Sequence, residues 1–310
     1  MLRVLVLGAA AGGGFPQWNC NYQTSRRARG GDPKARPRSQ SSLAVSADGE
    51  RWFLLNASPD LRQQINDNPP LHPRSGLRHS PIAGVVLTNA DVDHVAGLLS
   101  LRERQPLVVY ATGRVQAVLR ANSIFDVLAP DVVARVELAL DQAVELAGPD
   151  GASSGVVIEP FAVPGKVALY LEDGDAGENF GTVAEDTIAL EVRAREGGAR
   201  LFYVPGCAAL TAGLAARLDG APLVLFDGTL WRDDEMIAAG VGVKTGRRMG
   251  HMSMSGPEGS IAAFADLDVG RKLFIHINNT NPVLLDDSPE RAQAVAAGWE
   301  IAEDGMEIDL

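Results

Sequence analysis

Residues 87–99 read LTNADVDHVAGLL, and this stretch guides the interpretation of the rest of the chain. A run of apolar residues, 84–87, ends abruptly in carboxylates and one histidine, and an amphipathic helical pattern then begins. A tight turn after a strand lets Asp91, Asp93 and His94 converge on one point, which predicts a metal site. The alternative is a solvated helix N-terminus capped by aspartate, because carboxylates stabilise that end of the helix dipole.

The composition predicts an ordinary folded protein of 310 residues, of which 46% are hydrophobic. We interpret residues 1–310 as a single domain. The chain has 28 lysines and arginines against 39 aspartates and glutamates, and the net charge of −11 argues against nucleic-acid binding. Residues 26–38 are a basic exception. We interpret them as a long, mobile polar loop, and the alternative is a binding segment for an anionic substrate or partner.

The cysteines and the N-terminal residues bear on where the protein works. Cys20 and Cys207 lie far apart in the sequence and imply no disulfide framework, so a reducing, cytoplasmic location is expected. Residues 2–7 fit a buried first strand that enters a glycine-rich loop at 8–14 better than a signal peptide, because the apolar stretch is short. No later stretch is long and apolar enough to predict a membrane span.

The order of apolar runs and turn residues predicts two halves, each with strands first and helices after. Two facing sheets with helices outside fit this order, so the expected class is α/β (α+β), a four-layer αββα sandwich. Strands are predicted at residues 2–7, 41–46, 52–56, 84–87, 107–111, 132–138, 156–163, 167–171, 187–194, 200–204, 223–227 and 273–277. Helices are predicted at residues 113–121, 233–239, 257–267 and 289–297, with another starting at Ser58 and Pro59.

Three further residues are candidates for the same site. His276 ends an apolar strand and precedes three asparagines, which would be costly in a core and therefore indicate a binding site. His251 lies in a glycine-flanked loop, where it is either a hydrogen-bonded loop histidine or a metal or substrate contact. Asp227 follows another apolar strand and either forms a turn or holds a ligating imidazole through its second nitrogen. His72 and His79 are expected at the surface.

These motifs resemble the metallo-β-lactamase superfamily. The superfamily signature Thr-His-x-His-x-Asp-His corresponds here to residues 88–94. Asn89 and Asp91 stand where the first two histidines are usual, whereas Asp93 and His94 match the signature. The resemblance implies the αββα fold and a metal centre after this strand.

The pattern of missing ligands resembles one subfamily, the pyrroloquinoline quinone (PQQ) biosynthesis B proteins. Residues 161–166 lack the third usual histidine, and Cys207 stands near the position of the bridging aspartate of two-metal members. Several subfamily members carry a Cys-x-Cys-x-x-Cys zinc site, but Cys20, Tyr22 and Ser25 occupy its register here, so we predict no structural zinc. The segments that carry the resemblance are residues 7–20, 58–62, 88–101, 227–231, 250–253 and 276–282.

The resemblance implies a role in making PQQ from a Glu–Tyr-derived precursor. The role is either that of an iron-dependent oxygenase that hydroxylates the tyrosine ring or that of a non-catalytic carrier of PQQ or its precursor toward the periplasm. An oxygen-rich mononuclear centre favours Fe(II) over a dizinc hydrolase, with zinc as an alternative occupant after purification. Other proteins of PQQ biosynthesis and a second copy of the chain are further possible partners.

Residue roles follow from this resemblance. The predicted iron ligands are Asp91, Asp93, His94 and His276, with the alternative that Asp93 orients a neighbouring ligand instead. The predicted catalytic pair is His251, as an acid/base or substrate contact, and Asp227, as the group that holds a ligand. The predicted substrate-binding residues are Asn279, Arg62 and Arg248.

Overall fold

The computed structural model describes residues 1–177 and 179–310, in which fourteen strands form two seven-stranded sheets. The strands of the first sheet are β1 (Arg3–Gly8), β2 (Ser42–Ser46), β3 (Trp52–Leu55), β4 (Ile82–Val86), β5 (Leu107–Thr112), β6 (Val133–Leu138) and β14 (Glu307–Asp309). Those of the second are β7 (Val144–Ala147), β8 (Ser153–Ala162), β9 (Ile188–Ala194), β10 (Arg200–Val204), β11 (Leu223–Asp227), β12 (Arg271–Ile275) and β13 (Trp299–Ile301).

Both sheets mix antiparallel and parallel pairs, and the parallel strands position the site. The first sheet has the order β14-β1-β2-β3-β4-β5-β6 and the second β13-β12-β11-β10-β9-β8-β7. Strands β3 to β6 are parallel to one another, as are β10 to β13. Parallel strands end at one edge of their sheet, which is where ligand sites of such sheets form.

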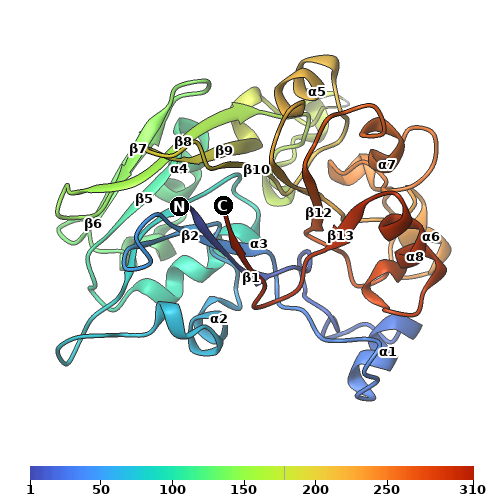
Figure 1. The fold of residues 1–310 in the computed structure, drawn as a ribbon, viewed down its shortest axis with the longest axis horizontal. Helices are drawn as coiled ribbons and strands as arrows, with labels where there is room; N and C mark the ends of the chain where they lie inside the picture. The colour runs from blue at the N-terminus through green and yellow to red at the C-terminus, as the bar shows by residue number, and fades with distance from the viewer. Residues whose placement is uncertain (178) are drawn as a thin grey trace.

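Helices cover the outer faces of both sheets. They are α1 (Gln23–Arg29), α2 (Leu61–Asp67), α3 (Val92–Val95), α4 (Gly113–Ala121), α5 (Ala212–Leu218), α6 (Glu235–Ala238), α7 (Ser260–Ala263) and α8 (Pro289–Ala296). Figure 1 shows the second sheet beside α5, α7 and α8, and the first beside α2, α3 and α4, with α1 at the margin near α8. The predicted αββα sandwich is confirmed.

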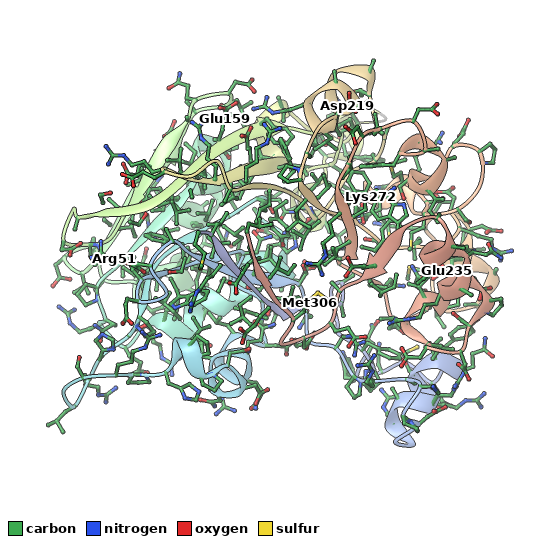
Figure 2. All side chains as sticks on the ribbon, in the orientation of Figure 1. Arg51, Glu159, Asp219, Glu235, Lys272 and Met306 are labelled. Atoms are coloured by element: carbon green, nitrogen blue, oxygen red, sulfur yellow. The ribbon has the colours of Figure 1, made fainter. Side chains whose placement is uncertain are left out.

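Three apolar clusters fill the spaces between these layers. Val6, Val45 and Ile158 belong to the cluster in which the inner faces of the two sheets meet. Leu119 belongs to the cluster beneath the helices of the first sheet, and Phe264 to the one beneath the helices of the second. Figure 2 shows how densely side chains occupy these spaces. Because alternate residues of a strand face opposite sides, each sheet contributes to an inner and an outer cluster.

The prediction that residues 26–38 form a long mobile loop is wrong. Part of this segment belongs to α1, and Arg38 is buried. Arg27 forms ion pairs with Asp32 and Asp287, while Arg36 and Arg38 both pair with Glu303. The basic side chains are therefore compensated by acids far along the chain, which a local reading of charge does not reveal.

Other element predictions also need correction. Residues 169–171 form a single 3-10 turn rather than a strand. Helix α2 begins at Leu61 with Asp60 at the N-cap, because the hydroxyl of Ser58 donates to the side chain of Gln64 instead of capping the helix. Strands β7, β13 and β14 and helices α1 and α5 were not predicted, and α7 is shorter than the predicted segment. In the described part of the chain, no helix has the length and apolar character needed to cross a bilayer.

Candidate metal centre

Histidines and aspartates from both sheets meet where the parallel strands end. Asp93 and His94 lie on α3, just after β4, whereas Asp227 is the last residue of β11 and His276 directly follows β12. His251 comes from the loop between α6 and α7. These residues form two overlapping groups, Asp93–His94–His276 and Asp227–His251–His276, and the candidate ligand atoms within each group lie within 4.8 Å of one another.

His94 is oriented as a metal ligand. Its Nδ1 lies 2.7 Å from Oδ1 of Asn89, an acceptor, so the proton sits on Nδ1 and the lone pair on Nε2. Nε2 is buried and has no hydrogen-bond partner among the described residues. Burial lowers the pKa of His94, which favours the neutral ring. A buried imidazole nitrogen without a partner is costly unless a cation binds it.

Asp93 and His276 form the second part of the same group. Nε2 of His276 lies 3.1 Å from Oδ2 of Asp93, and its Nδ1 lies 2.9 Å from Oγ1 of Thr229. With Nδ1–H donated to Thr229, a lone pair on Nε2 would face the carboxylate, so a proton or a metal ion must lie between them. Burial opposes a charged ring, but contact with Asp93 more than offsets it and raises the pKa of His276. The donor set therefore fits a cation.

The main chain at this point adopts a special geometry. His276 has φ of +59°, in the left-handed region that few non-glycine residues adopt. The extended backbone of β12 therefore ends just before this residue, and left-handed backbone of this kind is typical of functional sites. On the other side, a Cβ atom at Gly12 would lie 3.4 Å from the carboxylate of Asp93. The glycine-rich loop after β1 therefore borders the centre, and Gly12 itself is exposed.

Asp227 acts on the site through its neighbours. Its Oδ2 accepts from the main-chain N–H of Cys207 at 2.9 Å and from Nδ1 of His251 at 2.7 Å. Its Oδ1 accepts from the N–H and the hydroxyl of Thr229, at 3.0 and 2.7 Å. Burial tends to raise the pKa of Asp227, but His251 and the other donors lower it on balance. The carboxylate is charged and fully hydrogen-bonded, so it holds Thr229 and His251 in place beside the candidate ligands.

The three rings pack against one another. His251 is stacked on His276 with ring centroids 5.1 Å apart, and His94 meets His276 edge-on at 5.3 Å. Because Nδ1 of His251 is bonded to Asp227, its Nε2 remains available to a ligand or substrate.

Two positioning residues were missed in the sequence. Oγ1 of Thr229 contacts Asp227, Nδ1 of His251 and Nδ1 of His276, at 2.7 to 3.1 Å. Asn89 fixes His94, although the sequence comparison noted it only as a replaced histidine. Asn89 could have been found from its place in the signature, since an amide five residues before a ligand can reach its second nitrogen. No local pattern distinguishes Thr229 from other residues of a strand-end turn.

Asp91, a predicted ligand, lies outside both groups. It occupies the N-cap of α3, and its Oδ1 accepts from the N–H of Leu169 at 3.3 Å. The hydroxyl of Tyr170 donates to the carbonyl of Ala90 at 2.7 Å, so the segment after β8 closes over this turn. Contact with that distant segment, rather than with the metal centre, accounts for the orientation of the Asp91 carboxylate.

The predicted substrate-binding residues are not brought together. Asn279 is buried and binds the N-terminal segment, because its amide donates to Gln17 at 2.6 Å and its carbonyl accepts from Thr24 at 2.5 Å. Arg62 is exposed on α2, and its side chain makes no hydrogen bond or ion pair with another described residue. Arg248 lies in the same loop as His251 and binds Glu172 through both terminal nitrogens.

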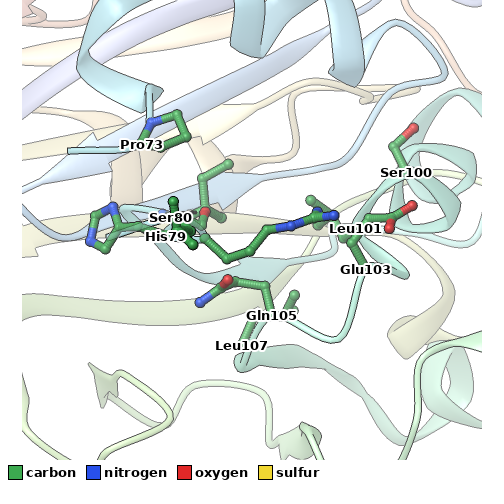
Figure 3. A pocket seen from close by; sticks show the side chains of 11 residues that line it. Pro73, His79, Ser80, Ser100, Leu101, Glu103, Gln105 and Leu107 are labelled. Carbon is green, nitrogen blue, oxygen red and sulfur yellow. Dashed lines mark hydrogen bonds between the residues drawn. The ribbon is translucent and has the colours of Figure 1, made fainter. Parts of the chain in front are cut away.

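The thiols of Cys20 and Cys207 and the rings of His72 and His79 belong to neither group. Cys20 and Cys207 are buried free thiols, and burial raises the pKa of Cys207 to about 12. Its Sγ donates to the carbonyl of Ala209. His79 lines a separate pocket of about 220 Å³ at the start of β4 and β5, the end of these strands opposite to the metal centre (Figure 3).

Comparisons with known proteins show the family and the fold of the chain. The model of the beta-lactamase superfamily domain matches residues 51–277. Coenzyme PQQ synthesis protein B of Gluconacetobacter diazotrophicus is 58% identical over 308 residues, 99% of each chain. The protein of the same name from Methylorubrum extorquens is 55% identical over 309 residues, which span both chains completely.

Solved structures extend the comparison. The crystal structure of Zn²⁺-bound PqqB from Methylobacterium extorquens matches with a TM-score of 0.94 and 55% identity, over 99% of this chain and 100% of that one. A diphosphatase of the PhnP family matches with a TM-score of 0.69 and 19% identity, over 99% of this chain and 96% of that one. The second likeness concerns the fold alone.

Proposed function

Because this chain belongs to the coenzyme PQQ synthesis protein B family of the beta-lactamase superfamily, we propose that it acts in coenzyme PQQ synthesis as an Fe(II)-dependent oxygenase. The proposed reaction hydroxylates the tyrosine ring of a Glu–Tyr-derived precursor. The observation that carries the proposal is the group Asp93–His94–His276, one carboxylate and two imidazoles. Two histidines and one carboxylate with open positions are typical of non-haem Fe(II) oxygenases.

The same donors also accept zinc, so the metal is part of the proposal. The M. extorquens relative was crystallised in a Zn²⁺-bound form. Imidazole and carboxylate ligands suit both metals, and selectivity then depends on geometry and availability. Bound Fe(II) would supply the activation of dioxygen, which zinc does not, because zinc has no redox chemistry.

The chain's own residues would hold the ligands and move a proton. Asn89 and Thr229 fix the rings of His94 and His276 with Nε2 directed to the group. His251, held by Asp227, presents its Nε2 beside His276, where it would exchange a proton with the substrate hydroxyl. All four hydrogen bonds of Asp227 are made within the protein, which argues against a second metal and against a two-metal hydrolase.

Anaerobic purification followed by loading with Fe(II) provides the test. The cross-linked Glu–Tyr precursor, a reductant and ¹⁸O-labelled dioxygen are added, and the product mass is measured. We expect labelled oxygen in the tyrosine ring, none with the Zn²⁺-loaded protein, and none with His276→Ala. Stoichiometric binding of the precursor without oxygen incorporation would instead support the carrier role.

A further inference from the structure

A surplus of positive charge lies beside the candidate metal centre. Arg248 binds the carboxylate of Glu172 with two hydrogen bonds of 3.0 and 2.7 Å, while Nζ of Lys166 lies 3.4 Å and Nζ of Lys244 3.8 Å from the same carboxylate. Hydrogen bonding from Arg248, with both lysines, lowers the pKa of Glu172 to about 2. Three cations thus surround one carboxylate, in a chain whose net charge is −11.

The cluster lies on the rim of the centre. A Cβ atom at Gly250, the residue before His251, would lie 3.1 Å from the side chain of Lys166. Three residues after Lys166, the N–H of Leu169 donates to Asp91, in the turn that carries Asp93 and His94. The segment 166–172 therefore contacts both the loop of His251 and the ligand turn, and it carries Lys166 and Glu172.

Lys244 and Arg248 are partly accessible, whereas the side chain of Lys166 is 16% exposed, and Arg248 adjoins a cleft. The side chains of Lys244 and Arg248 are 33% and 31% exposed, compared with 12% for Glu172. Arg248 also lines a cleft of about 650 Å³ together with Thr245 and Ser253. Solvent therefore reaches Lys244 and Arg248 more freely than the carboxylate that they bind. Guanidinium groups in such settings bind carboxylates through paired hydrogen bonds.

We propose that Lys166, Lys244 and Arg248 form a carboxylate-binding subsite for the substrate, which the carboxylate of Glu172 occupies when no substrate is bound. The subsite selects substrates that carry carboxylates near the reacting ring. A substrate carboxylate replaces Glu172 on Arg248 or joins it, since two positive charges remain uncompensated. This inference rests on the proposed function for the identity of the substrate, but it concerns binding and not oxygen transfer.

Equilibrium binding to the Zn²⁺-loaded protein tests the subsite without turnover. The probes are the cross-linked Glu–Tyr diamino acid and the same compound with its side-chain carboxylate amidated. We expect Arg248→Gln to weaken binding of the first probe about tenfold to a hundredfold, because a charge-assisted bidentate contact is lost. The affinity of Arg248→Lys for this probe should lie between those of the parent and Arg248→Gln, since lysine keeps the charge but cannot donate two parallel hydrogen bonds. The amidated probe should bind weakly to every variant.

Glu172→Gln tests whether Glu172 competes with the substrate for the cations or only keeps them in place. Removing the competing charge should tighten binding of the diamino acid about threefold to tenfold, in keeping with a charged contact near the surface. The matched control is Arg271→Gln, which breaks a bidentate pair with Glu300 at the opposite end of β12 and should leave binding unchanged. Weaker binding by Glu172→Gln, or equal binding of both probes, would overturn the subsite.

The outcome is separable from the proposed function. If the Fe(II)-loaded protein incorporates no oxygen but the variants follow the expected order of affinities, the oxygenase proposal fails and the subsite stands. If oxygen is incorporated and Arg248→Gln binds the diamino acid as the parent does, the subsite fails and the oxygenase proposal stands. Thermal melting of each variant establishes that it is folded.

Discussion

Asp93 and His94, which follow β4 of the first sheet, offer ligand atoms to the centre. Asp227, at the end of β11 in the second sheet, and His251, from the loop between α6 and α7, are instead held inside a hydrogen-bond network. Nε2 of His94 has no partner among the described residues, and Asp93 faces His276. Asp227, in contrast, accepts four hydrogen bonds. His276 belongs to both sides, since Thr229 holds one nitrogen and Asp93 faces the other.

This difference separates two tasks. Groups with unused lone pairs are suited to bind a cation, and groups that are fully hydrogen-bonded are suited to keep ligands in place. A metal centre built in this way loses its metal when the first side is changed and loses its geometry when the second side is changed. The predictions below test that division.

His94→Ala should have the largest effect, because it removes a ligand whose Nε2 has no other partner. We expect metal affinity to fall by roughly a thousandfold or more, given the large free energy shared among few ligands at such sites. Metal content after dialysis against a chelator measures it. His79→Ala, in the remote pocket, is the matched control and should keep the parent's metal content. Equal metal retention by the two variants would refute the ligand role of His94.

Asp227→Asn should have the next largest effect. The amide keeps the shape but places an N–H₂ group where the carboxylate accepts hydrogen bonds from Cys207, Thr229 and His251. We expect activity or metal affinity to fall about tenfold to a hundredfold, as for other groups that orient ligands. An unchanged rate and metal affinity would show that Asp227 has no part in positioning.

Thr229→Val should produce a smaller loss, because the methyl group keeps the volume but removes the hydroxyl that bridges Asp227 and His276. About a tenfold decrease in metal affinity is expected, in the range of a single lost hydrogen bond to a buried group. Thr229→Ser keeps the hydroxyl and should restore most of the affinity. Calorimetric titration with Zn²⁺ compares the two. If serine and valine behave alike, the hydroxyl is not what holds His276.

Glu235→Gln should have the smallest effect on the centre and a visible effect on stability. This buried carboxyl accepts from Thr280 at 2.5 Å and from the N–H of Trp231 at 2.7 Å, and so supports the segment after His276 from outside (Figure 2). Burial raises its pKa from 4.5 to about 7. The folded protein therefore keeps a proton that the unfolded chain releases, and stability falls as pH rises from 4.5 toward 7.

Glutamine removes this dependence, because it needs no proton to be neutral. The variant should be more stable than the parent by about 1–3 kcal/mol at pH near 8, with little difference near pH 4, as linkage requires. Urea unfolding of the metal-loaded proteins at the two pH values measures it. A stability difference that does not depend on pH would contradict the raised pKa.

Sequence reasoning located the centre because strand ends are easy to recognise. Asp93, Asp227 and His276 each follow an apolar run, and parallel strands end at one edge of a sheet, so residues far apart in the sequence could be expected to meet. His251 was less certain, since a loop histidine between glycines carries no such constraint. The fold class followed from the same strand order.

The unpredicted features depend on contacts between distant segments. Asp91 resembles Asp93 locally, and only the contact with Leu169 shows that its carboxylate faces another way. Asn279 is polar and lies beside the centre in sequence, yet it is buried against Gln17 and Thr24. Residues 26–38 could not be recognised as ordered, because Asp287 and Glu303, which pair with Arg27 and Arg36, lie 260 and 267 residues further along. Local patterns contain none of this information.

The bare glycine opposite Asp93 has a practical consequence. Gly12 is exposed, its backbone lies outside the left-handed region, and a Cβ atom there would be in ordinary van der Waals contact with the Asp93 carboxylate. A Cβ atom at position 12 thus fits beside Asp93, and side chains of increasing size there would narrow the approach to the centre step by step. Variants with alanine, valine and leucine at this position would restrict access to the centre to different degrees. Rates of access of gases and of larger molecules to the metal could then be compared across the series.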